Sequence, residues 1–251
     1  MKPMTRISRL LILALLLALT GGSVSAQVQV SWLEGEAHFP DDKKYTYTYI
    51  YRYPKVEVSS AATEEINHYF DTALQEMMQL MVPMYAADPI MAGDGGKLIR
   101  EAYEVTCNTD RYFSCLMTRS QTVEEGTLNS LRSVVFAADG EYAGQTLTLR
   151  GATGVGDSSV QMAALVFEDV WRQLEVVKQA GEPLLLEEVS YQVLAEEFYP
   201  ESHFYLDEEE NAVFYLQPGL LRPGKETLRF VYSREQLNAL IPAQSEGGNV
   251  P

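Results

Sequence analysis

The feature that most restricts the fold of this chain is a run of alternating tyrosines. In YTYTYIYRYPKVEV, residues 45–58, every second position from 45 to 53 is tyrosine, and threonine, isoleucine and arginine stand between them. Successive side chains of a β-strand point to opposite faces, so alternation in aromatic and β-branched residues predicts a strand. All five tyrosines then share one face of a sheet. That face either packs under a helix or forms an exposed aromatic platform that stacks on sugars or a peptide.

Helices are predicted on both sides of the middle of the chain. Apolar residues recur at helical spacing over 61–81, after serines that offer N-caps, and Pro83 opens a loop. A second amphipathic helix begins at Ser158 and Ser159 and ends at Gly181. Shorter helical stretches are predicted at 185–196 and after Ser233.

The remaining β-rich segments complete the predicted fold. Strands are predicted at 28–32, 97–106, 112–121, 130–137, 145–149, 203–207, 212–217 and 228–232. Strands predominate and helices interrupt them, which predicts an α+β fold: a largely antiparallel sheet with two or three packed helices. An N-terminal extension or strand covers 27–44, a single domain covers 45–240, and a disordered tail covers 241–251.

The N-terminus predicts export. Lys2, Arg6 and Arg9 precede an unbroken apolar run, and small residues follow it, as in a signal peptide over residues 1–26. The apolar run is shorter than the roughly 20 residues needed to span a bilayer. We therefore expect cleavage between Ala26 and Gln27, no integral membrane span after cleavage, and a secreted or cell-surface, extracytoplasmic protein; the alternative is an uncleaved N-terminal anchor.

The chain is strongly acidic. It carries 35 acidic against 19 basic residues, a formal net charge of −16. This charge repels nucleic acid and anionic membranes, so neither is expected as a partner. It either favours a cationic partner or only confers solubility.

Two cysteines stand in CNTDRYFSC. The polar residues between Cys107 and Cys115 predict a tight hairpin in which the two could face each other. Extracytoplasmic cysteine pairs tend to be oxidised, so we expect a disulfide, with two free buried thiols as the alternative. The three histidines lie at no zinc-ligand spacing from the cysteines, so no metal or cofactor is expected.

No catalytic constellation is legible, so the sequence predicts a protein that is not an enzyme. Gly154–Ser159 could hold an anion at a helix N-terminus but matches neither a P-loop nor a nucleophile elbow, and a capping serine explains it better. The acidic run Asp207–Glu210 reads as a solvated hairpin tip rather than a calcium loop, since it lacks the EF-hand pattern. His203 is a lone histidine on a strand. The many adjacent acid pairs could include a glycosidase pair, but solvated faces are the default.

Several motifs resemble a known family. Tyr53–Val56 precedes Ile66-Asn67, Phe204–Leu206 and Val213–Tyr215 flank an acidic turn, and an apolar strand leads into a polar-start helix over 228–237. This order is similar to the extracytoplasmic domain of the lysozyme-sensing anti-sigma factor RsiV and to a related domain in the peptidoglycan deacetylase PdaC. The resemblance implies an α+β domain of largely unknown function.

The resemblance also implies a binding surface and a function. The family's proline-rich loop, near where the sensor engages lysozyme, corresponds here to Gly219, Leu220, Leu221, Arg222 and Pro223, with Gly219 in place of the usual tyrosine. We expect a non-enzymatic binding or sensing domain whose partner is a cationic protein such as lysozyme, or a cell-wall glycan or peptide. The alternatives are a cell-wall-active hydrolase or deacetylase-associated enzyme, and a structural envelope protein.

Overall fold

The computed structural model describes residues 28–39, 47–57, 60–87, 96–123, 126–180, 185–186, 189–222 and 227–242. The predicted signal peptide with its cleavage point, most of the tail, and Pro223 lie outside the described residues. No helix in these ranges combines the length and the apolar character that crossing a bilayer requires.

The larger sheet has five strands in the order β1-β2-β3-β4-β5. They are β1 (Val30–Phe39), β2 (Tyr47–Val56), β3 (Lys97–Asn108), β4 (Tyr112–Val123) and β5 (Gly126–Ala137). Every neighbouring pair is antiparallel except β2 and β3, which are parallel and are joined by helices over the sheet. β1 pairs with β2 along its whole length, so the sheet begins N-terminal to the predicted domain start at residue 45.

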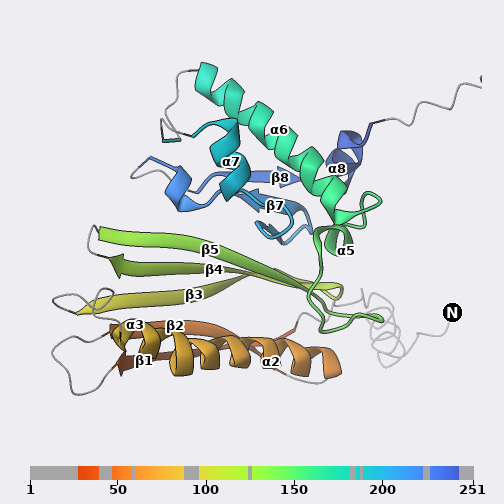
Figure 1. The fold of residues 1–251 in the computed structure, drawn as a ribbon. Helices are drawn as coiled ribbons and strands as arrows, with labels where there is room; N and C mark the ends of the chain where they lie inside the picture. The colour runs from red at the N-terminus through yellow and green to blue at the C-terminus, as the bar shows by residue number, and fades with distance from the viewer. Residues whose placement is uncertain are drawn as a thin grey trace, which may run out of the picture.

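The C-terminal half forms a smaller antiparallel sheet covered by helices. Its strands are β6 (Phe204–Leu206), β7 (Ala212–Tyr215) and β8 (Arg229–Tyr232). The helical elements are α5 (Leu149–Thr153), α6 (Ser159–Gln179), α7 (Tyr191–Glu197), the 3-10 turn η2 (Pro218–Leu220) and α8 (Arg234–Leu240). Figure 1 shows the layers: α2 on one side, then the two sheets, then α6. The predicted α+β fold, with its mostly antiparallel sheet, is confirmed.

The alternating tyrosines face inward. Tyr47, Tyr49 and Tyr53 of β2 are at most 2% exposed and lie beneath the helix that follows, so the prediction of a face packed under a helix is confirmed. The alternative prediction, that this strand forms an exposed aromatic platform, is wrong.

That helix is longer than predicted. It comprises α2 (Ala61–Glu76), a π-helical turn η1 (Met77–Met81) and α3 (Val82–Ala87). The expectation that Pro83 ends the helix is wrong. At the end of the π turn the Val82 N–H donates to the Met77 carbonyl, five residues back, and Pro83 then stands in the first turn of α3, where its missing N–H costs little.

β6 and β7 of the small sheet are buried on both faces, which explains their unbroken apolar sequences, whereas the edge strand β8 is partly exposed. Phe204, Leu206 and Phe214 pack with α6, whereas Tyr205 and Tyr215, with the opposite parity, pack against β4 and β5. The predicted hairpin around Asp207–Glu210 is confirmed.

One other predicted element is wrong, and one is confirmed only over part of its length. Residues 145–149 form one β-bridge at Thr146 and then enter α5, which Thr148 caps. In the segment 185–196, Leu185 bridges to Leu221, and of the residues that the structure describes there, the helical ones are those of α7, from Tyr191. Both are short apolar stretches, for which strand and helix patterns are hardest to separate.

The predicted disulfide between Cys107 and Cys115 does not form, and both cysteines are free and buried. Cys107 pairs with Ser114 and Cys115 pairs with Val105, with a β-bulge between Val105 and Cys107, so the register is one residue away from the predicted pairing of Cys107 with Cys115. The one-residue shift turns the two thiols to opposite faces of the sheet. Cys107 packs with the C-terminal core, Cys115 packs beneath α2, and burial raises the pKa of Cys107 to about 11.

Candidate functional site

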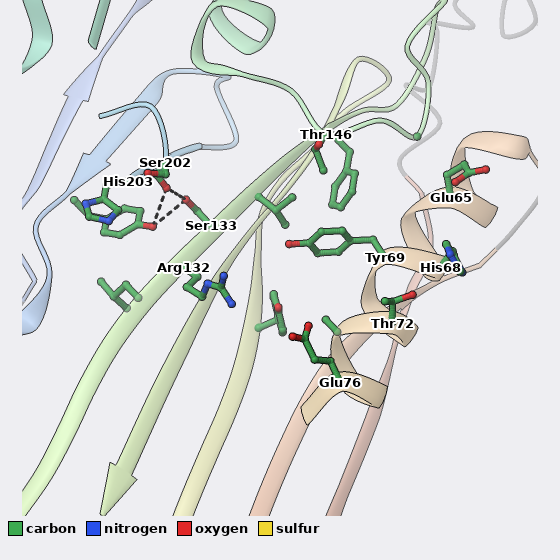
Figure 2. A pocket seen from close by; sticks show the side chains of 17 residues that line it. Glu65, His68, Tyr69, Thr72, Glu76, Arg132, Ser133, Thr146, Ser202 and His203 are labelled. Atoms are coloured by element: carbon green, nitrogen blue, oxygen red, sulfur yellow. Dashed lines mark hydrogen bonds between the residues drawn. The ribbon is translucent and has the colours of Figure 1, made fainter. Parts of the chain in front are cut away.

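A groove of about 720 Å³ runs between α2 and the outer strand β5 (Figure 2). One wall is α2, the floor is β5, and the other wall is the turn that leads into β6. It contains polar side chains from three separate segments. We take it as the candidate site because concave, mixed polar and apolar pockets are the usual place for ligands.

The helical wall follows from the periodicity of α2. Ile66 and Phe70 are buried against the sheet, while the polar residues of an adjacent stripe, at spacings of three and four, line the groove. These residues are Glu65, His68, Thr72 and Glu76. Ser60 and Thr63 form a capping box that fixes where the helix begins, and hence which side chains face β5.

The floor and the second wall meet at Ser133. Arg132, Val134 and Phe136 of β5 point to the α2 side. The Ser133 hydroxyl points the other way, where it lies within hydrogen-bonding distance of the Phe204 carbonyl and 3.0 Å from the Tyr215 hydroxyl. These bonds hold the turn against β5.

His203 is built into that second wall. Its ring stacks on Tyr215, and its Nδ1 accepts a hydrogen bond from the Tyr199 backbone N–H (3.2 Å). A nitrogen that accepts is unprotonated, so this contact requires the neutral ring. Burial agrees, because it lowers the pKa of His203 below its usual 6.5.

The ionisable groups of the groove have few partners. Among the described residues, no hydrogen bond or ion pair involves the side chains of Glu65, His68, Glu76 or Arg132. In Figure 2 the Glu76 and Arg132 side chains point into the space between α2 and β5. Solvent or a ligand must satisfy them.

The groove does not hold a legible catalytic arrangement. Ser133 donates to backbone carbonyls and has no base beside it, so it is not an activated nucleophile. Glu65 and Glu76 are three turns apart on one helix, roughly 16 Å along its axis, which exceeds the separation of glycosidase carboxylate pairs. No group of three or more metal-ligating side chains occurs within the described residues.

The loop predicted to bind lies beside the groove but is largely packed. Leu220 and Leu221 are buried in the C-terminal core, and Arg222 Nε donates to the Leu185 carbonyl (3.0 Å). Gly219 is exposed, with open space around its Cα. A binding role for this loop stays a prediction, and the exposed part that could serve it is small.

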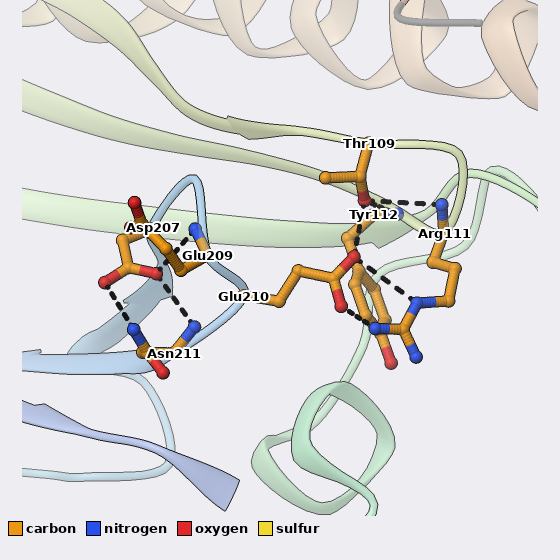
Figure 3. A network of polar contacts seen from close by, with 7 residues as sticks. All are labelled: Thr109, Arg111, Tyr112, Asp207, Glu209, Glu210 and Asn211. Carbon is orange, nitrogen blue, oxygen red and sulfur yellow. Dashed lines mark hydrogen bonds and ion pairs between the residues drawn. The ribbon is translucent and has the colours of Figure 1, made fainter. Parts of the chain in front are cut away.

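The acidic tip is structured rather than simply solvated (Figure 3). Asp207 Oδ1 accepts from the backbone N–H groups of Glu209 and Asn211, which closes the turn. Glu210 reaches the β3–β4 turn, where it accepts from Thr109 Oγ1 (2.8 Å) and pairs with Arg111. The prediction that a serine in Gly154–Ser159 caps a helix is confirmed, because the Ser158 side chain accepts a hydrogen bond from the Gln161 N–H at the start of α6.

Sequence reasoning missed the groove residues on α2 and β5. A usable signal was present, because Glu65, His68, Thr72 and Glu76 form a polar stripe at helical spacing. Nothing in the sequence showed that this stripe would lie opposite the edge of the sheet, since that depends on how α2 packs.

Comparison with known proteins identifies the fold. No family model and no curated protein sequence matches the chain. Solved structures do: a DUF3298 family member from Bacteroides fragilis superposes with a TM-score of 0.54 at 14% identity, covering 85% of this chain and 93% of that one. A DUF3298 family protein from Pseudomonas aeruginosa gives a TM-score of 0.56 at 11% identity, covering 88% and 99%. At such identities the likeness is one of fold.

Proposed function

We propose that this chain is an extracytoplasmic binding domain, without catalytic activity of its own, that takes a cationic ligand in the groove between α2 and β5. The fold it shares with DUF3298 proteins, a class of unknown function, agrees with the predicted relationship to the RsiV and PdaC domains but does not select a ligand. The choice of ligand therefore rests on the chain's own groove.

The observation that carries the proposal is the set of unpaired ionisable groups in the groove. The side chains of Glu65, His68, Glu76 and Arg132 are exposed, so a ligand that enters the groove can pair with them without displacing an intramolecular partner. α2 carries Glu64, Glu65, Asp71 and Glu76, and it has neither lysine nor arginine. Together with the net charge of −16, this wall favours a basic partner.

A cationic protein such as lysozyme is the partner to test first. The protein is expressed from its full sequence and purified, and it is then titrated with hen-type lysozyme by calorimetry. The titration is done at low salt and at about 150 mM salt, where the Debye length is about 8 Å. We expect micromolar or tighter binding that persists at the higher salt and weakens in the double variant Glu65→Gln/Glu76→Gln. The control Glu64→Gln/Asp71→Asn removes the same charge from the same helix outside the groove and should bind as the unaltered protein does.

Two results contradict the proposal. Binding that disappears at about 150 mM salt, or that falls equally in both double variants, means that only the overall charge acts. Release of sugar or acetate from purified peptidoglycan, abolished by one Asp or Glu substitution, means that the chain is an enzyme.

A further inference from the structure

The outer edge of β5 is filled at two places by groups that act as a neighbouring strand. The Gln217 side chain pairs with Leu131 as a strand residue would: its Oε1 accepts from the Leu131 N–H, and its Nε2 donates to the Leu131 carbonyl, both at 2.9 Å. Farther along, the Leu147 N–H donates to the Val135 carbonyl (2.7 Å), and the Ala137 N–H donates to the Gln145 carbonyl (3.1 Å).

Between these two places the edge is open at Ser133. β5 pairs with β4 without a bulge, so residues 131, 133, 135 and 137 turn their backbone groups to the same, outer side. The partners of Leu131, Val135 and Ala137 confirm this parity. No hydrogen bond within the described residues uses the Ser133 N–H or C=O, and Ser133 lines the groove.

We propose that the groove binds an extended basic peptide segment of a partner protein, which adds to β5 as a short strand by pairing with the backbone of Ser133. This inference rests on the proposed function and specifies its binding mode. Open strand edges are templates for another chain, and addition to an edge is a recurrent mode of peptide recognition. Gln217 and residues 145–147 bound a gap of about 14 Å, four residues of strand, so about three residues of the peptide fit within it and pair through the open backbone groups of Ser133.

The walls specify which side chains the peptide carries. A strand at this edge presents alternate side chains to α2 and the others to the turn at Ser202 and His203. On the α2 side these side chains would face Glu65 and Glu76. Lysine or arginine facing α2 would pair with these carboxylates. Arg132 is the one lysine or arginine among the described lining residues, and it opposes such a ligand.

The test uses a fluorescent, acetylated and amidated peptide that alternates lysine with threonine, and fluorescence anisotropy at about 150 mM salt. Two further peptides carry N-methyl groups on alternate amides, one at the lysines and one at the threonines. Residues of one parity turn their N–H groups to the same edge. We therefore expect one methylated peptide to lose at least roughly tenfold in affinity, about 1.4 kcal/mol, and the other to bind within about twofold of the parent.

Two variants at one position test the protein side. Ser133→Pro removes the outward N–H without touching the β4–β5 ladder, a place where an edge strand tolerates proline. Ser133→Ala removes the hydroxyl and its bonds to the turn but keeps the N–H. We expect peptide binding to fall by at least about tenfold in Ser133→Pro and to stay within about threefold in Ser133→Ala. Should Ser133→Pro fail to fold, the methylated peptides decide alone.

Arg132→Gln gives an independent readout. Because this substitution removes a charge that opposes a basic ligand, the lysine peptide should bind several-fold more tightly to it. A peptide that alternates glutamate with threonine should not bind detectably to the unaltered protein or to this variant. Equal losses with both methylated peptides, or Ser133→Pro binding as the unaltered protein does, overturns strand addition. If lysozyme binding still depends on Glu65 and Glu76 in that case, the proposed function stands without it. If the lysine peptide does not bind at all, this inference is wrong whatever lysozyme does.

Discussion

Two sets of carboxylates on the α2 side of the large sheet have opposite fates. Glu101 of β3 is 3% exposed, and both its oxygens are engaged: Oε2 accepts from the hydroxyls of Tyr49 and Tyr53 at 2.6 Å, and Oε1 lies 3.0 Å from Arg119 Nε. Glu65 and Glu76 lie on the same side of the sheet, at the margin of α2, and the described residues offer them no such partners.

The difference separates structure from recognition. A buried carboxylate must be paired, because the free energy of leaving its charge unpaired is several kcal/mol. Beneath α2 the tyrosine strand supplies the donors, and burial together with Glu101 raises the pKa of both hydroxyls, so they remain protonated donors. At the margin of the same helix no donor is built in, which leaves those carboxylates for solvent or a ligand.

The largest effect on stability is expected from a substitution that removes the charge of the buried, paired carboxylate Glu101. Glu101→Gln leaves the mostly buried Arg119 without its counter-charge. The Arg119 Nε–H makes no hydrogen bond within the described residues, and the Arg119 Nη2 lies 2.8 Å from Met77 Sδ. We expect the free energy of unfolding to fall by about 3–5 kcal/mol, measured by urea denaturation. Glu65→Gln is the matched control and should change it by no more than about 0.5 kcal/mol. Similar losses in the two variants would contradict the division drawn above.

A smaller effect is expected at the acidic tip, where a carboxylate is paired but partly exposed. Glu210 adopts a left-handed backbone, with φ 63°, while its side chain binds Thr109 and Arg111. Glu210→Ala should lower the free energy of unfolding by about 1 kcal/mol. Glu210→Gly loses the same contacts but relieves the backbone strain, so it should be about 1 kcal/mol more stable than the alanine variant. If alanine is the more stable of the two, the left-handed backbone is not strained.

The pH dependence of stability tests the role of His203, a buried ionisable group in the wall of the groove. Burial lowers the pKa of His203 in the folded state, so the unfolded chain binds more protons below about 6.5. The contribution of His203 to stability is therefore complete above that pH and is lost as the pH falls through the folded-state pKa. We expect the thermal midpoint of the unaltered protein to drop between pH 7 and pH 5, by more than in His203→Phe. Parallel profiles for the two proteins would rule out this role.

The smallest effect concerns the thiols, which burial protects without any bond between them. Because Cys107 and Cys115 face opposite sides of the sheet, a reductant should leave the thermal midpoint unchanged. Thiol titration of the unfolded, unreduced protein should find both cysteines free. A single disulfide found in this assay would restore the prediction from the sequence.

Local patterns predicted the fold well and the site poorly. The tyrosine alternation gave the correct inward face of β2, and the flanks of Asp207–Glu210 gave the correct hairpin, because both depend on residues near in sequence. The cysteine prediction failed because Cys107 pairs with Ser114 and not with the neighbouring Cys115, and a shift of one position reverses which face a side chain occupies. The parallel pairing of β2 and β3 depends on the long connection between them and has no local signal.

The groove escaped prediction for the same reason. Its wall, floor and second wall come from α2, β5 and the turn before β6, which are far apart in the chain. Each segment showed ordinary features alone: a polar helical stripe, a strand and a lone histidine. The pairing of the Gln217 amide with Leu131 could not be predicted either, because a single glutamine has no sequence pattern of its own.

The one parallel contact in the large sheet has a consequence for how the chain folds. β3, β4 and β5 follow one another through short turns, so they can form a meander from contacts near in sequence. β2 can join β3 only after the connection that contains α2, η1 and α3 has closed, and β1 reaches the sheet only through β2. Loop closure of this kind is slow, so the meander should precede the tyrosine strand along the folding pathway. The tyrosines that carry so much of the core would then arrive late, and the chain would spend its early folding with that aromatic surface in water.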